Sequence, residues 1–442
     1  MLKLKLDQVA PLQRAAAIAA TETCFAGLVL PGGAPNGERD YVVADLRPVP
    51  DDAYLVRTAI SATLKPEFCS HLANQAKQNG AGVLLAHTHI GNQPLDGFSV
   101  IDDGAEPPLA VYFNRRLPGR ANLAAVITAQ KIHAREMGPG PTQPVAFVGS
   151  ELVMPAQPSS RVDGKFDRQV RAFGEDGQRA LSALTVAIVG VGGTGSVVAQ
   201  QLAHLGVIRF VLIDPDKVES TNLNRLVGAA TSDIDRPKVN VAADHIKRIN
   251  AMAKCQVVQG DVTHPDIAAT LTAADFIFGC TDSMASRAVM NQLAYQYYIP
   301  CIDMGVAIGT EAGIVMYIGG RVQMLSPGLA CLVCTDKLDS EQVRREMMTQ
   351  EERKKDRYIV GEQVSQPAVI SLNSQVSSAA ITMFLSAVTG MPAGARMLTF
   401  DAMRGTVRPV AADPRPHCIV CSPEGALGQG ARWSLPTRGG TR

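Results

Sequence analysis

A glycine-rich turn between an apolar strand and a helix constrains the fold of this chain more than any other feature. The segment "TVAIVGVGGTGS" (185–196) predicts a buried strand that ends in a tight turn, and "VVAQQLAHLGV" and "RFVLIDPD" predict a helix and a second strand directly after it. This order is the opening βαβ unit of a nucleotide-binding sheet, in which backbone N–H groups of the turn face phosphates. The turn alone fits ATP or NAD, since Asp214, after the second strand, suits a ribose in both.

The length of the chain indicates more than one domain. It has 442 residues, whereas compact domains usually run about 100–200 residues. Proline, serine and glycine gather in "MPAQPSSRVDGK" (154–165), which is typical of a linker. We therefore expect one domain at 1–155, a second at 156–430 and a loose tail at 431–442. The first is predicted to be α+β, with strands at 24–30, 41–46 and 81–89 and a helix at 66–80, and the second α/β.

Charge and cysteine content narrow the class of protein. Lys and Arg number 42 and Asp and Glu 41, so the formal net charge of +1 creates no overall field that would recruit nucleic acid or an anionic membrane. No apolar run approaches the roughly 20 residues of a membrane span. Four of the nine cysteines form CxxC pairs, which in a reducing compartment indicates metal rather than disulfides. We expect a cytoplasmic enzyme that binds neither nucleic acid nor membrane.

Two histidines in "HTHIGNQPLDGFSVIDD" (87–103) indicate a metal site in the first domain. His87 and His89 are two residues apart at the end of a predicted strand, so their side chains point to one face. Asp102 supplies a third ligand and leaves the fourth position to water, as in catalytic zinc sites. Ser99 is placed to stabilise an oxyanion. The alternative is an exposed turn whose histidines have no special role.

The same residues resemble the JAMM metalloprotease family of MPN or JAB domains, whose signature is a distant Glu followed by HxH, a loop and SxxD. The resemblance covers roughly residues 10–150 and implies that Glu22, in "TETCFAGLVL", is the general base. Two departures concern the loop: Ile90 replaces the family's usual proline, and the segment from His89 to Ser99 is about two residues longer. The resemblance implies a zinc-dependent peptidase or isopeptidase.

Several motifs of the second domain resemble the ThiF/MoeB superfamily of ubiquitin-activating-enzyme-like adenylyltransferases over residues 163–425. They are "DPDKVESTNLNR" (214–225), "RPKV" (236–239), "CTDS" (280–283) and "KFDRQ" (165–169). The resemblance favours ATP over NAD and implies a Rossmann-like adenylation domain. It implies that Gly190, Gly192, Gly193 and Gly195 form the phosphate loop and that Asp214 binds the ribose. It also implies that Asn222, Arg225 and Lys238 bind the triphosphate and that Asp282 binds Mg²⁺. Arg168 would be the cation donated across a homodimer interface. For Arg168, the alternative is an exposed side chain on a linker.

Two cysteine pairs predict a closed metal site. Cys331 with Cys334 and Cys418 with Cys421 each form a CxxC, and together they offer four thiolates to one tetrahedral ion. The superfamily carries the same pairs, which implies structural zinc. Two unrelated pairs, or a redox site, are the alternatives; the second is disfavoured because neither CxxC follows a strand and begins a helix.

One residue of many superfamily members is missing. Where they carry a cysteine that accepts the activated carbonyl as a thioester, the segment "DRYIVGEQVSQPAVIS" (356–371) has Ile359. Because no cysteine lies between Cys334 and Cys418, we expect direct attack on the acyl-adenylate by an outside thiol, sulfide or amine, on a conjugating protein for example. Cys280 and Cys301 are expected to be buried, inert core residues beside the nucleotide site.

Together these features predict a bifunctional enzyme. Its first domain cleaves a precursor or conjugate after the C-terminal glycine of a ubiquitin-like protein, with one catalytic zinc. Its second adenylates that glycine with MgATP and holds one structural zinc. Two alternatives stay open: an adenylyltransferase for a sulfur-carrier protein in thiocarboxylate-based biosynthesis, and a chain in which one half is only a binding module.

Overall fold

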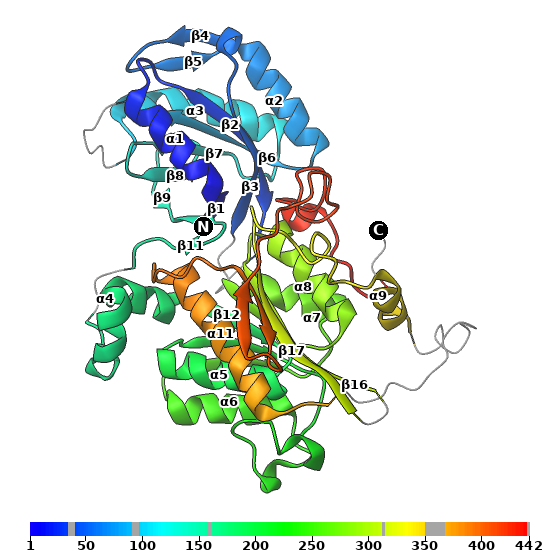
Figure 1. Ribbon diagram of the computed structural model, residues 1–442. Coiled ribbons are helices and arrows are strands. Elements are labelled where there is room, and N and C mark those ends of the chain that lie inside the picture. Colours follow the sequence, from blue (N-terminus) through cyan, green and yellow to red (C-terminus); the bar gives the residue numbers. More distant parts are fainter. Residues whose placement is uncertain (34–39, 91–96, 158–160, 312–313, 350–366, 440–442) are drawn as a thin grey trace.

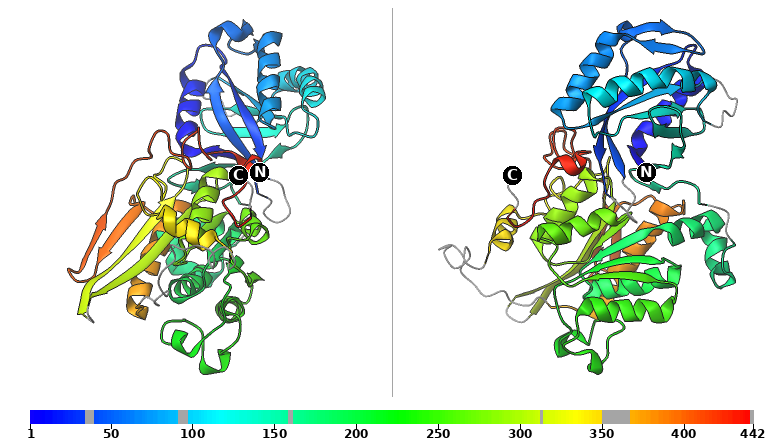
Figure 2. Two further views of the ribbon diagram at one scale, coloured as in Figure 1. Left: turned by 90° about the vertical axis from the view of Figure 1, so that its right-hand side faces the viewer. Right: turned by 180° about the vertical axis from the view of Figure 1, so that it is seen from behind.

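The computed structural model describes residues 1–442 except 34–39, 91–96, 158–160, 312–313, 350–366 and 440–442. The described part forms two units, each built on one large β-sheet, and they lie one above the other in all three views (Figures 1 and 2). The last strand of the first sheet ends at Val153, and the first long helix of the second unit begins at Asp167. No helix among the described residues is long and apolar enough to cross a membrane.

The N-terminal unit is a nine-stranded mixed sheet with helices on both faces. Its strand order is β11-β10-β1-β3-β2-β6-β7-β8-β9. The strands are β1 (Leu2–Lys5), β2 (Cys24–Pro31), β3 (Tyr41–Pro48), β6 (Gly82–Thr88), β7 (Leu123–Ile127), β8 (Ile132–Glu136), β9 (Thr142–Gln143), β10 (Val145–Val148) and β11 (Leu152–Val153). The helices are α1 (Leu6–Ile18), α2 (Pro66–Gln78) and α3 (Val100–Arg116), and β4 (Tyr54–Arg57) and β5 (Ala62–Leu64) form a separate pair.

Local sequence explains the elements that carry the first candidate site. Strand β6 reads GVLLAHT and buries its apolar run between β2 and β7. Helix α2 begins with Pro66, which suits the first helical turn because the missing N–H has no intrahelical acceptor there. Helix α3 begins after Ser99, whose side chain and that of Asp102 form a reciprocal capping box. Helix α1 packs on one face of the sheet, and α2 and α3 pack on the other.

The C-terminal unit is an eight-stranded sheet in the order β14-β13-β12-β15-β16-β17-β18-β19. The first five strands run parallel and the last three antiparallel. They are β12 (Thr185–Val189), β13 (Arg209–Ile213), β14 (Lys254–Val258), β15 (Phe276–Gly279), β16 (Cys301–Glu311), β17 (Ile314–Leu325), β18 (Met397–Asp401) and β19 (Thr406–Pro409). The helices are α4 (Asp167–Ala183), α5 (Gly193–Leu205), α6 (Lys238–Ile249), α7 (Pro265–Thr270), α8 (Met284–Gln296), α9 (Ser340–Met347) and α11 (Ile370–Val388).

This sheet is covered on both faces. Helices α5, α6 and α11 pack against one face and α7 and α8 against the other (Figure 1). Phe384 of α11 meets the rings of Phe276 and Phe278 edge-on, with centroids 4.8 and 5.3 Å apart, so β15 is fixed to α11 by a buried aromatic cluster. Replacing such a buried phenylalanine by alanine costs about 3–5 kcal/mol. The parallel half of the sheet is therefore a rigid support for the residues at its carboxyl edge.

The two units share part of one hydrophobic core. Val42, Val148 and Leu152 of the N-terminal unit belong to the buried cluster that contains Phe384. Polar contacts cross the same interface: Tyr298 donates to the Val43 carbonyl over 3.2 Å. The units are thus packed against each other rather than joined only by the linker.

Part of the segment expected to be a loose tail, residues 431–442, contacts the rest of the C-terminal unit. The fully buried Gln296 donates from Nε2 to the carbonyls of Gly430, at 2.7 Å, and Trp433, at 2.6 Å. Arg438 donates to the Glu346 carbonyl at 2.9 Å. These contacts hold residues 433 and 438 against the rest of the unit. The tail boundary at residue 431 stays a prediction, and residues 440–442 lie outside the described part.

Candidate functional site

The phosphate loop connects β12 to α5, and backbone atoms exclude a Cβ at two of its four predicted glycine positions, Gly190 and Gly195. Gly190 has φ +86, and a Cβ there would lie 2.6 Å from the Cys280 carbonyl oxygen. A Cβ on Gly195 would lie 1.8 Å from the Gly190 carbonyl oxygen, and one on Gly193 would lie 2.3 Å from Nδ2 of Asn373. A Cβ on Gly192 would meet open space, and α5 begins there without a side-chain cap. The backbone N–H groups of this helix end can therefore receive an anion.

Asp214 follows β13, the strand beside β12, and fixes the phosphate loop. One carboxylate oxygen accepts the N–H of Val191 at 2.7 Å and the other accepts that of Asp216 at 2.9 Å. The residue is 5% exposed, and this burial raises the pKa of Asp214. Its oxygens retain lone pairs, so the predicted contact with a ribose is compatible with this role.

The predicted cationic residues lie in the segments that follow β13. Arg225 passes beside the loop, with its Cδ 3.4 Å from the position of a Cβ on Gly193, and donates to the Thr221 carbonyl at 2.7 Å. Lys238 begins α6 and pairs with Asp216 at 2.8 Å. The buried Asn222 accepts the Glu219 N–H over 3.4 Å in a capping turn. Loop glycines, Asp214 and Arg225 thus come together at the carboxyl edge of the sheet.

The other two predicted residues lie in different places. Asp282 is exposed and follows β15, the neighbour of β12 on the side away from β13. Because β12, β13 and β15 are parallel, their carboxyl ends meet at one edge, and Asp282 faces the same edge as the loop. Arg168 is exposed at the start of α4, where Gln169 donates to the His204 carbonyl near the end of α5. Arg168 therefore lies at the opposite end of α5 from the phosphate loop of its own chain.

A charged cluster beside this edge was not predicted from the sequence. Asp303 of β16 is 1% exposed and contacts two guanidinium groups, Arg287 Nε at 3.3 Å and Arg321 NH2 at 2.6 Å. Asp303 is in register with Gly279 at the end of β15. Two cations face one carboxylate there, so the three side chains together carry a net charge of +1. No short motif indicates the cluster, since its members come from α8, β16 and β17.

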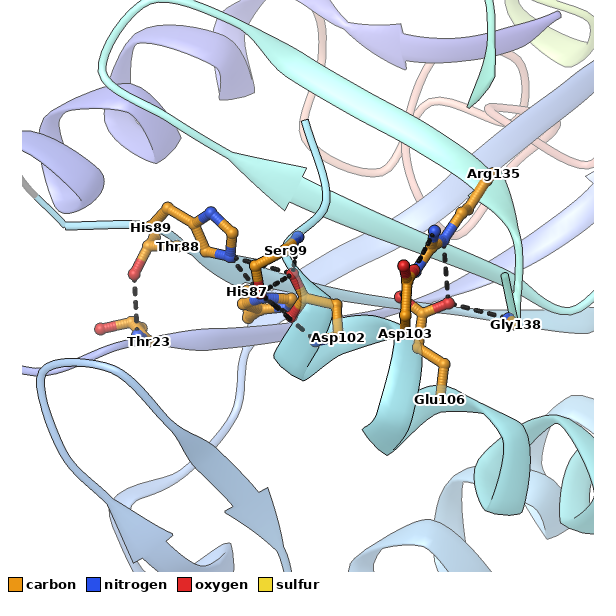
Figure 3. A network of polar contacts seen from close by, with 10 residues as sticks. All are labelled: Thr23, His87, Thr88, His89, Ser99, Asp102, Asp103, Glu106, Arg135 and Gly138. Carbon is orange, nitrogen blue, oxygen red and sulfur yellow. Dashed lines mark hydrogen bonds and ion pairs between the residues drawn. The ribbon is translucent and has the colours of Figure 1, made fainter. Parts of the chain in front are cut away.

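The histidine site is assembled at the ends of β2 and β6. Cys24, the first residue of β2, is in register with His87 of the antiparallel β6, so Glu22, two residues before β2 begins, lies near His89, which follows the end of β6. The ligand atoms of Glu22, His87 and His89 all lie within 4.8 Å of one another. Nε2 of His87 is 2.9 Å from one oxygen of Asp102, and Nε2 of His89 is 3.3 Å from the other (Figure 3). The structure thus brings together the residues predicted from the HxH motif.

Helix α3 presents the carboxylate and the serine of this site. The Ser99 hydroxyl donates to Asp102 Oδ2 at 2.7 Å, and the Ser99 N–H donates to the same oxygen at 2.6 Å. Burial alone would raise the pKa of Asp102, but the hydrogen bonds with His87 and His89 outweigh it and hold the pKa well below its ordinary value. Burial raises the pKa of Glu22, partly offset by both histidines. Residues 91–96 of the preceding loop, whose length departs from the JAMM pattern, lie outside the described part.

These donors fit a zinc ion. The two Nε2 atoms are 3.1 Å apart, whereas zinc–nitrogen bonds of about 2.0–2.1 Å in a tetrahedron separate two nitrogens by roughly 3.3 Å. If one Nε2 carries a proton, it can donate that proton to the other Nε2. If neither does, two lone pairs face each other, and a cation between them relieves the repulsion. Nδ1 of His89 is buried without a hydrogen-bond partner in the described structure. His87, His89 and Asp102 suit the ligand roles, with Glu22 beside them.

The four thiols form a second, closed site. Sulfur–sulfur distances are 3.7 Å for Cys331–Cys334, 3.5 Å for Cys331–Cys418 and 3.4 Å for Cys334–Cys421. Zinc–sulfur bonds of about 2.3 Å in a tetrahedron give about 3.8 Å. The hydrogen bond with the Cys421 thiol lowers the pKa of Cys331, and the Arg415 N–H points at the Cys334 sulfur over 3.2 Å. This set fits tetrahedral zinc and leaves no ligand position open.

The remaining cysteines are unsuited to nucleophilic work. Burial raises the pKa of Cys24 to about 12 and that of Cys255 to about 11. It also raises the pKa values of Cys69, Cys280 and Cys301. None of the cysteines outside the four-thiol cluster is exposed. The position of Ile359, where a cysteine would be expected, lies outside the described residues.

Comparison with known proteins identifies the class of the C-terminal unit. The ThiF family matches residues 166–420, more than half of the chain, and the chain belongs to this family. The C-terminal unit is accordingly an ATP-dependent adenylyltransferase domain of this family. The match begins at residue 166, so the N-terminal unit lies outside it, and the JAB/MPN assignment of that unit stays a prediction.

Particular relatives are similar over parts of the chain. Molybdopterin-synthase adenylyltransferase of Escherichia coli is 29% identical over 259 residues, which cover 58% of this chain and 95% of that enzyme. Sulfur carrier protein ThiS adenylyltransferase of Escherichia coli is 34% identical over 152 residues, 34% of this chain and 57% of that one. Ubiquitin-like modifier-activating enzyme 5 of Bombyx mori is 28% identical over 235 residues, 49% of this chain and 56% of that one.

Proposed function

We propose that the C-terminal unit adenylates the terminal carboxylate of a small sulfur-carrier or ubiquitin-like protein ending in glycine. The observation that carries this proposal is the meeting of the phosphate loop, Asp214 and Arg225 at one sheet edge, in a unit that belongs to the ThiF family. The names of the similar adenylyltransferases include a sulfur carrier protein and a ubiquitin-like modifier, which supports this substrate class.

The reaction needs positioned charge rather than a protein nucleophile. The carboxylate oxygen of the partner attacks the α-phosphorus of ATP, the bond from that phosphorus to the bridging oxygen breaks, and pyrophosphate leaves with the electron pair. Arg225 and Lys238 neutralise the charge that accumulates on the phosphoryl group and pyrophosphate. Asp282 would hold Mg²⁺, which would neutralise phosphate charge, and the N–H groups at the start of α5 would bind the phosphates. Lys238 exchanges its contact with Asp216 for a phosphate oxygen.

The charged cluster supports a direction of approach for the carboxylate. Asp214 lies on one side of the phosphate loop, at β13, while Arg287, Asp303 and Arg321 lie on the other, beyond β15. With the ribose at β13 and the phosphates at β12, the side of β15 and β16 remains for the acyl substrate. The net positive charge of the cluster favours an anionic chain end there.

Two features shape the next step and the assembly. Transfer goes directly to an outside thiol, sulfide or amine, on a conjugating protein for example, because the cysteines outside the four-thiol cluster are buried or half-buried and have raised pKa values. The active enzyme is a homodimer in which Arg168 reaches the phosphate site of the partner; its position far from the loop of its own chain supports donation in trans.

ATP–pyrophosphate exchange tests the adenylation proposal. The purified full chain is supplied with MgATP and candidate small proteins ending in glycine, each with a matched version whose terminal carboxylate is amidated. Exchange that requires the free carboxylate supports the proposal, and exchange independent of it contradicts the proposal. Mixing Arg168→Ala and Lys238→Ala chains restores part of the activity if the site is shared. A fully active monomer contradicts the shared site.

For the N-terminal unit we propose a zinc-dependent peptidase that cleaves after the same glycine, from a precursor or a conjugate. A zinc ion held by His87, His89 and Asp102 would activate water and polarise the scissile carbonyl. Glu22, buried beside the histidines, accepts the proton of the attacking water and passes it to the leaving amine. The Ser99 hydroxyl, which donates to Asp102 Oδ2 in the structure, turns to donate to the oxyanion as the carbonyl is attacked. Both histidines lie within hydrogen-bond reach of Asp102, and this convergence supports the second function.

Glu22→Gln separates this function from that of a binding module. The variant keeps the shape and the neighbouring ligands but cannot accept the proton, so zinc content stays at two ions per chain while cleavage of a C-terminally extended partner falls at least about 100-fold. A wild-type chain that holds two zinc ions and cleaves no extended partner is a binding module. One zinc ion per wild-type chain, unchanged in His87→Ala, rules out the metal site itself.

A further inference from the structure

We propose that Arg135 is a positioning residue for the histidine metal site, holding the first two turns of α3 so that Asp102 meets both histidines at bonding distance. This inference rests on the proposed zinc site of the N-terminal unit. Arg135 acts through the helix, since its guanidinium is a cation and cannot be a metal ligand.

Arg135 contacts two carboxylates of α3. It lies on β8 and is 4% exposed. Its Nε is 3.0 Å from one oxygen of Glu106 and its NH2 is 2.9 Å from the other, a two-pronged contact. Its NH1 is 2.7 Å from Asp103, one turn earlier on the same face of the helix (Figure 3). A planar guanidinium holds such a pair of carboxylates in one orientation, which a lysine ammonium cannot do.

The contact extends to the residue before the helix. The guanidinium lies over the ring of Phe98, 3.8 Å from its centroid, and Phe98 precedes Ser99, the N-cap. On the other side, the Gly138 N–H donates to Glu106 at 2.8 Å. Arg135 therefore contacts residues on both sides of the turn that carries Ser99 and Asp102.

The negative charges at the start of α3 require a cation such as Arg135. Asp102, Asp103 and Glu106 place three carboxylates in the first two turns of α3, and Asp102 and Glu106 are four residues apart on one face. Glu106 is 6% exposed, and burial of an unpaired carboxylate is costly. Without Arg135, the helix end would have to move toward water to solvate Glu106.

Such a movement would affect the metal directly. Asp102 is the neighbour of Asp103, and its two oxygens already lie at 2.9 and 3.3 Å from the two imidazoles. Metal–ligand bonds in functional sites fall within about 0.2 Å of their ideal lengths, so a shift of one turn by even a fraction of an ångström weakens the carboxylate ligand. Residues that orient ligands in this way typically change metal affinity by about 10–100-fold.

The test compares zinc affinities of full-length variants, measured by competition with a chelator. Arg135→Met keeps an unbranched apolar stem but removes the guanidinium and its charge. We expect the exchangeable zinc to bind about 10–100-fold more weakly, with the tight zinc and pyrophosphate exchange unchanged. Arg135→Lys keeps the charge without the fork and should recover only part of the affinity. The control is Arg116→Met, at the exposed end of the same helix, where the side chain contacts Asn74.

Three outcomes decide the inference. An unchanged zinc affinity in a folded Arg135→Met chain overturns it. If Arg135→Met does not fold, Asp103→Asn takes its place, because it removes only the more exposed of the two carboxylate contacts of Arg135. Several-fold weaker zinc binding in Asp103→Asn supports the inference, and unchanged binding overturns it. If the wild-type chain has no exchangeable zinc, the inference falls together with the proposed peptidase, and the wild-type measurement alone reveals this.

Discussion

The two candidate metal sites differ in how completely the protein surrounds the ion. Four thiols converge at sulfur–sulfur distances of 3.4, 3.5 and 3.7 Å, and three of their residues belong to a buried apolar cluster. At the other site two imidazoles and one carboxylate converge, and Glu22 stands beside them as a fourth group within 4.8 Å of the histidine nitrogens. Under the proposed functions, the ligand set is complete where zinc would support the fold, and it is open where the proposed peptidase needs a water and a base.

Cys331→Ser should produce the largest effect. Structural zinc contributes about 10–16 kcal/mol in small peptides, which is comparable with the whole stability of a domain. We expect loss of the tight zinc and of the folded C-terminal segment, measured by elemental analysis and thermal unfolding. Cys255→Ser, at a half-buried thiol of β14 outside the cluster, is the control and should retain both zinc ions. Full zinc content with an unchanged melting temperature in Cys331→Ser would remove the distinction between the sites.

His87→Ala should remove the zinc of the open site and leave the four-thiol site intact. It removes one ligand of the open site, so the chain should lose one of two zinc ions and its peptidase activity, while adenylation continues. The melting temperature should change by only a few degrees because His87 lies at the end of β6 rather than in the core. His71→Ala, on the exposed face of α2, should leave zinc content at two. Loss of both ions in His87→Ala would show that the sites depend on each other.

Lys238→Ala tests whether chemistry at the nucleotide edge is independent of both metals. Removing one cation that stabilises developing charge typically lowers a rate about 10²–10³-fold, and we expect that loss in pyrophosphate exchange with both zinc ions retained. Arg236→Ala is the matched control, since Arg236 lies two residues away and is exposed in pairs with Asp233 and Asp244. Equal losses in the two variants would assign the effect to the segment rather than to Lys238.

Gly192→Ala should have the smallest effect on stability. A Cβ there meets open space, so we expect an unchanged melting temperature but a KM for ATP raised about tenfold, because phosphates approach the backbone at this position. Gly195→Ala should instead lower the melting temperature, since its Cβ would lie 1.8 Å from the Gly190 carbonyl oxygen. An unchanged KM in Gly192→Ala would show that the open space is not used by the nucleotide.

Sequence reasoning succeeded where the information is local. The strands expected at 24–30, 41–46 and 81–89 and the helix expected at 66–80 are found at Cys24–Pro31, Tyr41–Pro48, Gly82–Thr88 and Pro66–Gln78. The glycine turn, HxH and CxxC also depend on short spacings, since alternation along a strand or a tight turn fixes where side chains point. The ThiF family match agrees with the motifs quoted for the second domain.

Sequence reasoning missed contacts between single residues far apart in the chain. Arg135 of strand β8 reaches Glu106 of helix α3, and Asp303 of β16 meets Arg287 of α8 and Arg321 of β17. Nothing in the pattern around residue 296 indicates that Gln296 binds residues 430 and 433. Such contacts cannot be predicted before the order of the strands is known, because a single polar residue gives no periodic pattern in the sequence.

The shared core has a consequence for anyone who wishes to divide this enzyme. Val42, Val148 and Leu152 are each at most 4% exposed because residues of the C-terminal unit cover them. Expressing residues 1–155 alone would uncover these side chains, each worth roughly 1.5–3 kcal/mol when buried, and create a sticky surface on the truncated fragment. Heating the intact protein should therefore melt both halves in one calorimetric transition, and independently soluble halves would require polar substitutions at these three positions.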